Sequence, residues 1–138
     1  MISKKAEYAI AALADLARLN QGEKTTTRSI ACRQKIPGNL ILQLIASLRE
    51  AGWVACSRGP GGGVTLIQDP AGISLRQVIE LFDGSLGISR CLAEDKPCRD
   101  NCSLRGILSE AQGKMLAVLE QVTIKDLIAS TGRNHCTN

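Results

Sequence analysis

Apolar residues recur at helical spacing through most of the first fifty positions. Over residues 3–20 they fall three and four positions apart, and Ser3 can cap the helix that this spacing predicts. The same spacing predicts a short helix over 28–35 and a third helix over 38–51. Two helices joined by a short turn and preceded by another helix are typical of a helix-turn-helix unit, which binds DNA.

The hydrophobic pattern changes after residue 52. Residues 53–57 and 64–67 are predicted to form two short strands around the segment Arg-Gly-Pro-Gly-Gly-Gly at 58–63. A hairpin placed directly after a helix-turn-helix is the wing of a winged helix. The glycine run is not predicted to be a nucleotide-binding loop, because such a loop opens into a helix and supplies a lysine, whereas here a strand follows.

The second half of the chain is helical again, with one irregular stretch. Ser74 and Gln77 can form a capping box for a helix that ends near Phe82, and residues 84–102 show no periodicity. A long helix is predicted over 103–122, and a short helix and a tail follow it. Apolar residues of the long helix alternate steps of four and three, a heptad seam that predicts packing against a partner: Leu104, Leu108, Ala111, Met115, Val118 and Val122.

Charge and composition narrow the class of protein. Residues 1–69 contain nine basic and five acidic side chains and so carry the whole net charge of +4. Residues 70–138 contain eight basic and eight acidic side chains and are neutral. The basic surplus therefore lies in the predicted winged helix, as expected for a unit that binds DNA. Aromatic residues make up only 2% of the chain, which disfavours a single-strand binder that stacks bases on rings.

The sequence also bears on location. It contains no apolar stretch long enough to span a membrane, and no convincing signal-peptide cleavage site follows the first residues. We therefore expect a cytoplasmic protein with no membrane partner.

Three of the six cysteines, Cys91, Cys98 and Cys102, fall within twelve residues of the irregular stretch. Three thiolates this close can converge on one metal centre, and soft donors favour iron–sulfur clusters, zinc or copper(I). Zinc sites usually have four Cys or His ligands in tighter pairs, and the single histidine lies in the tail. Three ordinary thiols are the alternative. Cys32 and Cys56 lie in predicted elements and are interpreted as buried thiols.

Candidate DNA contacts gather in the winged helix. Asn39 and Gln43 lie four residues apart on one face of the third helix, and either amide can pair with adenine in the major groove. Arg58 can enter a narrow minor groove. The residues after it make a slim wing that can approach the DNA backbone: Gly59, Pro60, Gly61 and Gly62. Phosphate contacts are expected from Arg28, Arg33 and Lys35.

Four motifs carry a family resemblance. They are KKAEYAIAALADLA, QKIPGNLILQLIASLREAGWV, SRGPGGGV and the three-cysteine loop. Together they resemble the iron–sulfur winged-helix transcription regulators of the IscR/NsrR type, over about residues 1–130. The resemblance implies a homodimer with an antiparallel dimerisation helix and an iron–sulfur cluster, either [2Fe-2S] or [4Fe-4S]. By the family's motif, Cys91, Cys98 and Cys102 match the cysteine ligands.

Three positions depart from parts of this family or match only some of its members. IscR-type proteins place a histidine three residues after the third cysteine, where this chain has Arg105, which cannot be a ligand. NsrR-like relatives use an acidic residue near the start of the partner's first helix, and Glu7 matches that position. The usual glutamate before the matching glutamine of the recognition helix is Leu42 here, so the target sequence does not carry over.

The sequence thus predicts a mainly α fold with a small β-hairpin, in two parts. Residues 1–70 form a winged helix-turn-helix DNA-binding domain, and residues 71–138 hold the cluster-binding loop (84–102), the long dimerisation helix (103–122) and a C-terminal helix and tail. The expected function is a dimeric regulator that binds a palindromic double-stranded DNA operator. Its cluster would sense redox state, nitric oxide or iron supply.

Two alternatives stay open. One is a winged-helix regulator that senses by cysteine thiol oxidation without a cluster, and the other is an iron–sulfur electron-transfer or cluster-carrier protein. An enzyme with a small-molecule substrate is not expected, because the sequence has no catalytic carboxylate pair, no Ser/His/Asp set and no histidine in a predicted element.

Overall fold

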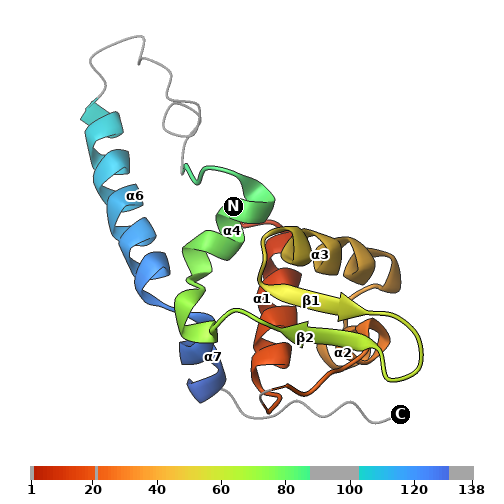
Figure 1. Ribbon diagram of the computed structural model, residues 1–138. Coiled ribbons are helices and arrows are strands. Elements are labelled where there is room, and N and C mark those ends of the chain that lie inside the picture. The colour runs from red at the N-terminus through yellow and green to blue at the C-terminus, as the bar shows by residue number, and fades with distance from the viewer. Residues whose placement is uncertain (1, 21, 88–102, 131–138) are drawn as a thin grey trace.

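Helix α1 lies at the centre of the fold; four helices and strand β2 (Gly63–Leu66) contact it, and α6 (Ser103–Gln121) lies on the outer side of α4 (Figure 1). The computed structural model describes residues 2–20, 22–87 and 103–130. Four of the seven buried residues of α1 (Lys4–Ala17) are alanines, which let neighbouring helices approach closely. The helices that contact α1 are α2 (Thr27–Gln34), α3 (Gly38–Glu50), α4 (Leu75–Asp83) and α7 (Ile124–Ser130).

The caps predicted at Ser3 and at Ser74 form, and Thr26 caps a further helix. The Ser3 side chain accepts a hydrogen bond from the amide of Ala6, and Thr26 does the same for Ser29 at the start of α2. Ser74 and Gln77 form the complete capping box of α4. The first helix ends at Ala17, about one turn earlier than the apolar pattern predicted.

The small sheet is a wing. Strands β1 (Val54–Ser57) and β2 (Gly63–Leu66) pair antiparallel, with Val54 opposite Leu66 and Ser57 opposite Gly63. The backbone of Thr25, just before α2, pairs with that of Val64 through N–O distances of 3.0 and 2.6 Å. The hairpin loop extends beyond α2 at the right of Figure 1. The mainly α, winged-helix fold is therefore confirmed.

The second half of the chain packs back onto the first. A 3-10 turn, η1 (Pro70–Gly72), connects the wing to the second half of the chain. The chain then runs through α4, and α6 (Ser103–Gln121) lies against α4 (Figure 1). After α6, the Ile124 amide donates to the carbonyl of Ile73 at 3.0 Å, which returns the chain to the start of α4. Helices α4 and α7 belong to the second half of the chain, but both pack on α1 in the first half. This packing does not separate two parts at residue 70, so the proposed boundary stays a prediction.

Helix α6 buries none of its residues in the single chain. Leu104, Ile107 and Val118 are 54%, 64% and 58% exposed. Of the helices in the described residues, none is long and apolar enough to cross a bilayer.

Candidate functional site

Helix α3 has one buried and one exposed face. The buried residues are Ile41, Leu44, Ile45 and Leu48. The exposed residues include Asn39, Leu42, Gln43 and Arg49. The side chains of Asn39 and Gln43 are thus available to a ligand, as their predicted role requires. No side chain caps the start of α3 at Pro37, and the Leu40 amide donates to the Pro37 carbonyl at 2.9 Å.

A basic groove separates α3 from the wing. Its volume is about 500 Å³, and Arg49 and Arg58 are its two charged lining residues. Thr26 and Thr27, at the start of α2, line it together with Leu42 of α3. None of the described residues that line the groove is acidic. A groove of this charge, open beside an exposed helix face, suits the phosphate backbone of a nucleic acid.

The turn of the wing requires glycine. The amide of Gly62 donates to the carbonyl of Gly59 at 2.8 Å. A Cβ atom at Gly62 would lie only 2.5 Å from the carbonyl oxygen of Ser57 and 2.8 Å from that of Gly59. The loop is therefore folded too tightly for any side chain at this position. Arg58 is exposed at the start of the loop, as expected for a wing that approaches DNA.

Arg33 does not have the role that the sequence suggested. Instead of facing a phosphate, its Nε and Nη2 atoms donate to the carboxylate of Asp15 at 2.9 and 2.6 Å, and Nη2 donates to the hydroxyl of Thr25 at 3.0 Å. The hydrogen bond to Asp15 raises the pKa of Arg33. The interpretation of Arg33 as a phosphate contact is therefore wrong. Arg28 and Lys35 are exposed, and their phosphate contacts stay predictions.

The two cysteines interpreted as buried thiols are both exposed. Cys32 lies on the surface of α2 and is disulfide-bonded. Cys56 is a free thiol on β1 and lines the groove beside α3. The interpretation of these residues as core thiols is therefore wrong. The apolar character of cysteine favours burial, but neither position faces the core in this register.

Cys91, Cys98 and Cys102 lie outside the described residues. The structure describes the helices on either side of them. The carboxylate of Asp83, the last residue of α4, accepts hydrogen bonds from the Ser3 amide at 2.9 Å and from the Ser3 hydroxyl. The end of α4 is thereby fixed to the start of α1. The chain enters residues 84–102 close to the helix turn that carries Glu7.

The carboxylate of Glu7 is accessible. Its side chain is 52% exposed and pairs with Lys4 at 3.1 Å across the first turn of α1. This ion pair raises the pKa of Lys4. Within the ranges that the structure describes, no three His, Cys, Asp or Glu residues are grouped closely enough to hold a metal ion. A complete ligand set would therefore have to include residues beyond those ranges.

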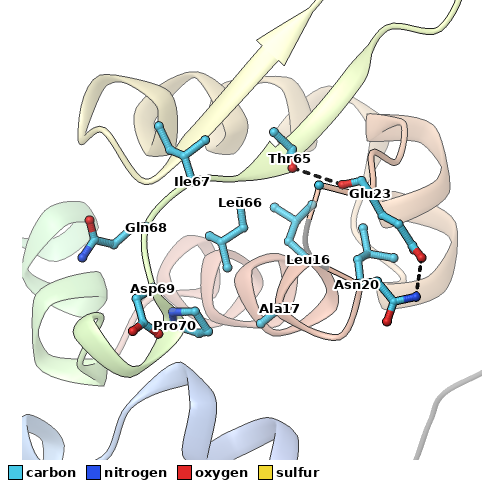
Figure 2. Close-up of a pocket in the computed structure, with 12 residues that line it drawn as sticks. Leu16, Ala17, Asn20, Glu23, Thr65, Leu66, Ile67, Gln68, Asp69 and Pro70 are labelled. Atoms are coloured by element: carbon cyan, nitrogen blue, oxygen red, sulfur yellow. Dashed lines mark hydrogen bonds between the residues drawn. The ribbon is translucent and has the colours of Figure 1, made fainter.

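A second hollow, of about 460 Å³, lies between the end of α1 and the strand β2 (Figure 2). Several of its polar side chains bond to each other or to the local backbone. The Asn20 amide donates to the carboxylate of Glu23, and the Thr65 hydroxyl donates to the Glu23 carbonyl at 3.1 Å. The carboxylate of Asp69 accepts from the amide of Ala71 at 3.0 Å. The Thr65–Glu23 hydrogen bond holds the wing against the connection between α1 and α2, which is a structural role.

Comparison with known proteins gives a consistent result. The model of the Rrf2 family, described as an iron-dependent transcriptional regulator, matches residues 2–130. The HTH-type transcriptional regulator NsrR of Bacillus subtilis is 31% identical, over 88% of this chain and 86% of its own.

Two solved structures have the same fold. The cysteine regulator CymR of B. subtilis superimposes with a TM-score of 0.83 at 26% identity, over 96% of this chain and 98% of its own. The IscR of T. potens has a TM-score of 0.76 at 28% identity, over 96% of this chain and 93% of its own.

Proposed function

This chain belongs to the Rrf2 family of transcriptional regulators, and we propose that it is a cytoplasmic homodimer whose binding to a palindromic operator is controlled by an iron–sulfur cluster. The observation that carries the DNA-binding part is the exposed face of α3 beside the basic groove and the slim wing. Because the family and its relatives are transcriptional regulators, we no longer consider an electron-transfer protein, and we have no reason to expect catalysis.

In the proposed complex, the N-terminal half of α3 enters the major groove of each half-site. Asn39 and Gln43 then face base edges, where either amide can pair with adenine. Arg58 follows the wing into the minor groove, and the backbone of Gly59, Pro60, Gly61 and Gly62 passes the phosphates closely. Arg28, exposed in the first turn of α2, contacts a phosphate and fixes the register.

Cys91, Cys98 and Cys102 would hold the cluster, with Glu7 of the partner subunit as the fourth ligand. Three thiolates and a carboxylate form a donor set that suits iron, and the accessible carboxylate of Glu7 supports its part in that set. A bound cluster would supply a link between subunits that oxidation, nitric oxide or iron shortage removes.

The residues of this chain provide the connection from that site to the DNA-binding surface. Ser3 and Asp83 fix the start of α1 to the end of α4, while the same α1 packs on α2 and α3. A change in the position of the α1 N-terminus relative to the partner therefore alters the distance between the two recognition helices. The population of the DNA-competent dimer shifts accordingly.

The test is anaerobic purification followed by iron and sulfide analysis, with absorption and Mössbauer spectroscopy. The proposal expects a coloured protein that contains both elements. Cys98→Ala should abolish the cluster and make operator binding insensitive to nitric oxide and oxidants. Cys56→Ser is the control and should retain iron, since Cys56 lies on the wing strand. A colourless protein without iron, whose Cys98→Ala variant binds DNA like the wild type under all conditions, would contradict cluster sensing.

Thiol oxidation without a cluster is the second candidate mechanism. In that mechanism Cys91, Cys98 and Cys102 would form disulfides and would hold no cluster. The isolated protein would then contain no iron or sulfide. A thiol reductant would change the DNA affinity of the wild type and leave that of a Cys98→Ala variant unchanged.

A further inference from the structure

Leu42 is an apolar residue on the polar, exposed face of α3. Its side chain is 62% exposed on α3, although neighbouring exposed positions of that helix are polar. Asn39 precedes it by three residues and Gln43 follows it directly, so the three side chains share one side of the helix. No packing within the described part of the chain explains a leucine at this position, because the buried face of α3 is formed by other residues.

The position of Leu42 on α3 fits a base contact. It is the fifth residue of the helix, and the first turns of a recognition helix are the ones that reach base edges. Leu42 also lines the groove that contains Arg49 and Arg58. A duplex whose backbone runs along this groove, with Arg58 reaching into the minor groove, would bring a base pair of the major groove to Leu42.

The major groove presents one apolar group to such a side chain, the C5-methyl group of thymine. A leucine offers no hydrogen-bond donor or acceptor, so it gains nothing from the polar edges of guanine, cytosine or adenine. Its contact with a methyl group removes apolar surface of both partners from water, which is favourable. The neighbouring amides of Asn39 and Gln43 suit adenine. About two or three successive A·T pairs could therefore contact all three side chains favourably.

We propose that Leu42 is a specificity-determining residue that contacts a thymine methyl group in each operator half-site, next to the adenine bound by Asn39 or Gln43. This inference rests on the proposed DNA-binding function and adds a base preference to it. The loss of a single methyl contact is expected to weaken binding about fourfold per half-site.

The experiment begins with selection of preferred duplexes from a randomised DNA library by the wild-type protein. Each thymine of the selected half-site is then replaced by uracil, which removes the methyl group and keeps the base pair. Fluorescence anisotropy should show one position at which uracil weakens binding of the wild type about fourfold. Leu42→Ala should bind the thymine and uracil duplexes equally. Leu42→Glu should favour cytosine at the same position, because a carboxylate can accept from its amino group.

Ile67→Ala is the matched control. Ile67 is 60% exposed, follows β2 at the end away from the hairpin loop and does not line the groove, so this variant should keep the wild-type response to uracil. Thermal unfolding of each variant checks that the fold is intact.

Two results would overturn the inference, and they differ from each other. If Gln43→Ala weakens binding but no thymine-to-uracil replacement does, DNA binding stands and the role of Leu42 fails. If selection returns no preferred sequence, sequence-specific DNA binding itself fails, and the inference fails with it.

Discussion

The Nη2 atom of Arg33 lies 2.6 Å from Oδ2 of Asp15, and the Nε atom lies 2.9 Å from Oδ1, so the two side chains form a bidentate ion pair between α2 and α1. Asp15 is 6% exposed and also accepts from the side-chain amide of Gln34 at 3.0 Å. Through the Thr25 hydroxyl, the same arginine reaches the segment that pairs with β2. One guanidinium thus connects the central helix, the helix-turn-helix and the wing.

Loss of the charge at Asp15 should destabilise the protein. Asp15→Asn keeps the size of the side chain but leaves Arg33 without its anion, and we expect the free energy of unfolding to fall by about 2 kcal/mol. Because the pKa of Arg33 is raised in the folded state, this contribution is present at neutral pH and is lost as the pH rises into strong alkali. Urea unfolding monitored by circular dichroism measures the change.

Glu80→Gln is the control for this measurement. It breaks an ion pair with Arg76 at 3.0 Å that lies on the surface, where such pairs contribute little. Its unfolding midpoint should stay close to that of the wild type. Equal effects of the two substitutions would mean that the Asp15–Arg33 pair has no special structural role.

The fold was largely predictable because its signals are local. Hydrophobic spacing and capping residues such as Ser74 and Gln77 act within a few positions, and the structure contains the elements that they predict. The role of Arg33 was not predictable, because its partner Asp15 lies 18 positions away and both residues belong to helices whose relative position is a tertiary property. Neither the exposure of Cys32 and Cys56 nor the disulfide bond of Cys32 had a signal in the hydrophobic pattern.

The candidate site shows the same division. The wing and the exposure of Asn39 and Gln43 follow from the glycine run and from the helix period. The groove between α3 and the wing depends on how the hairpin packs, so the place of Thr26, Thr27 and Arg49 in its lining emerges only from the structure. In the sequence, Leu42 is an apolar residue outside the predicted buried stripe of the helix. Its role can be interpreted only once the structure shows that its side chain is exposed.

The wing turn should not tolerate a side chain at Gly62. Gly62→Ala places a Cβ against two backbone carbonyls, so the turn must open, at a cost of about 1 to 3 kcal/mol. Because the strain lies in the hairpin loop, operator binding should weaken more than global stability. Anisotropy titration compares this variant with Gly106→Ala in α6, where a Cβ meets nothing within 4 Å. Wild-type affinity in Gly62→Ala would show that the wing turn has no part in DNA binding.

Helix α6 should become more stable when its glycines are replaced. Gly106 and Gly113 lie within α6, a Cβ at either meets nothing within 4 Å, and both fall outside the heptad seam. Alanine at both positions should raise the free energy of unfolding by about 1 to 2 kcal/mol, because glycine is the weaker helix former. Thermal and urea unfolding measure the gain. A loss of stability instead would place these positions in a close helix contact.

The heptad seam of α6 predicts a dimer that a single charge can break. Val118 lies on this seam and is 58% exposed in the single chain, so Val118→Glu leaves the fold of the monomer intact. In a dimer the same glutamate would be buried without a partner, which is strongly unfavourable. Sedimentation velocity should therefore show a monomer for Val118→Glu and a dimer for the wild type.

Ser109→Glu provides the matched control for the dimer prediction. It adds the same charge to an exposed position of α6 outside the seam, and it should remain dimeric. The monomeric variant should also bind each half-site independently, with the affinity of one recognition helix. It should lose the additional operator affinity that a dimer obtains by binding both half-sites at once. A dimeric Val118→Glu protein that binds the full operator normally would move the subunit interface away from this seam.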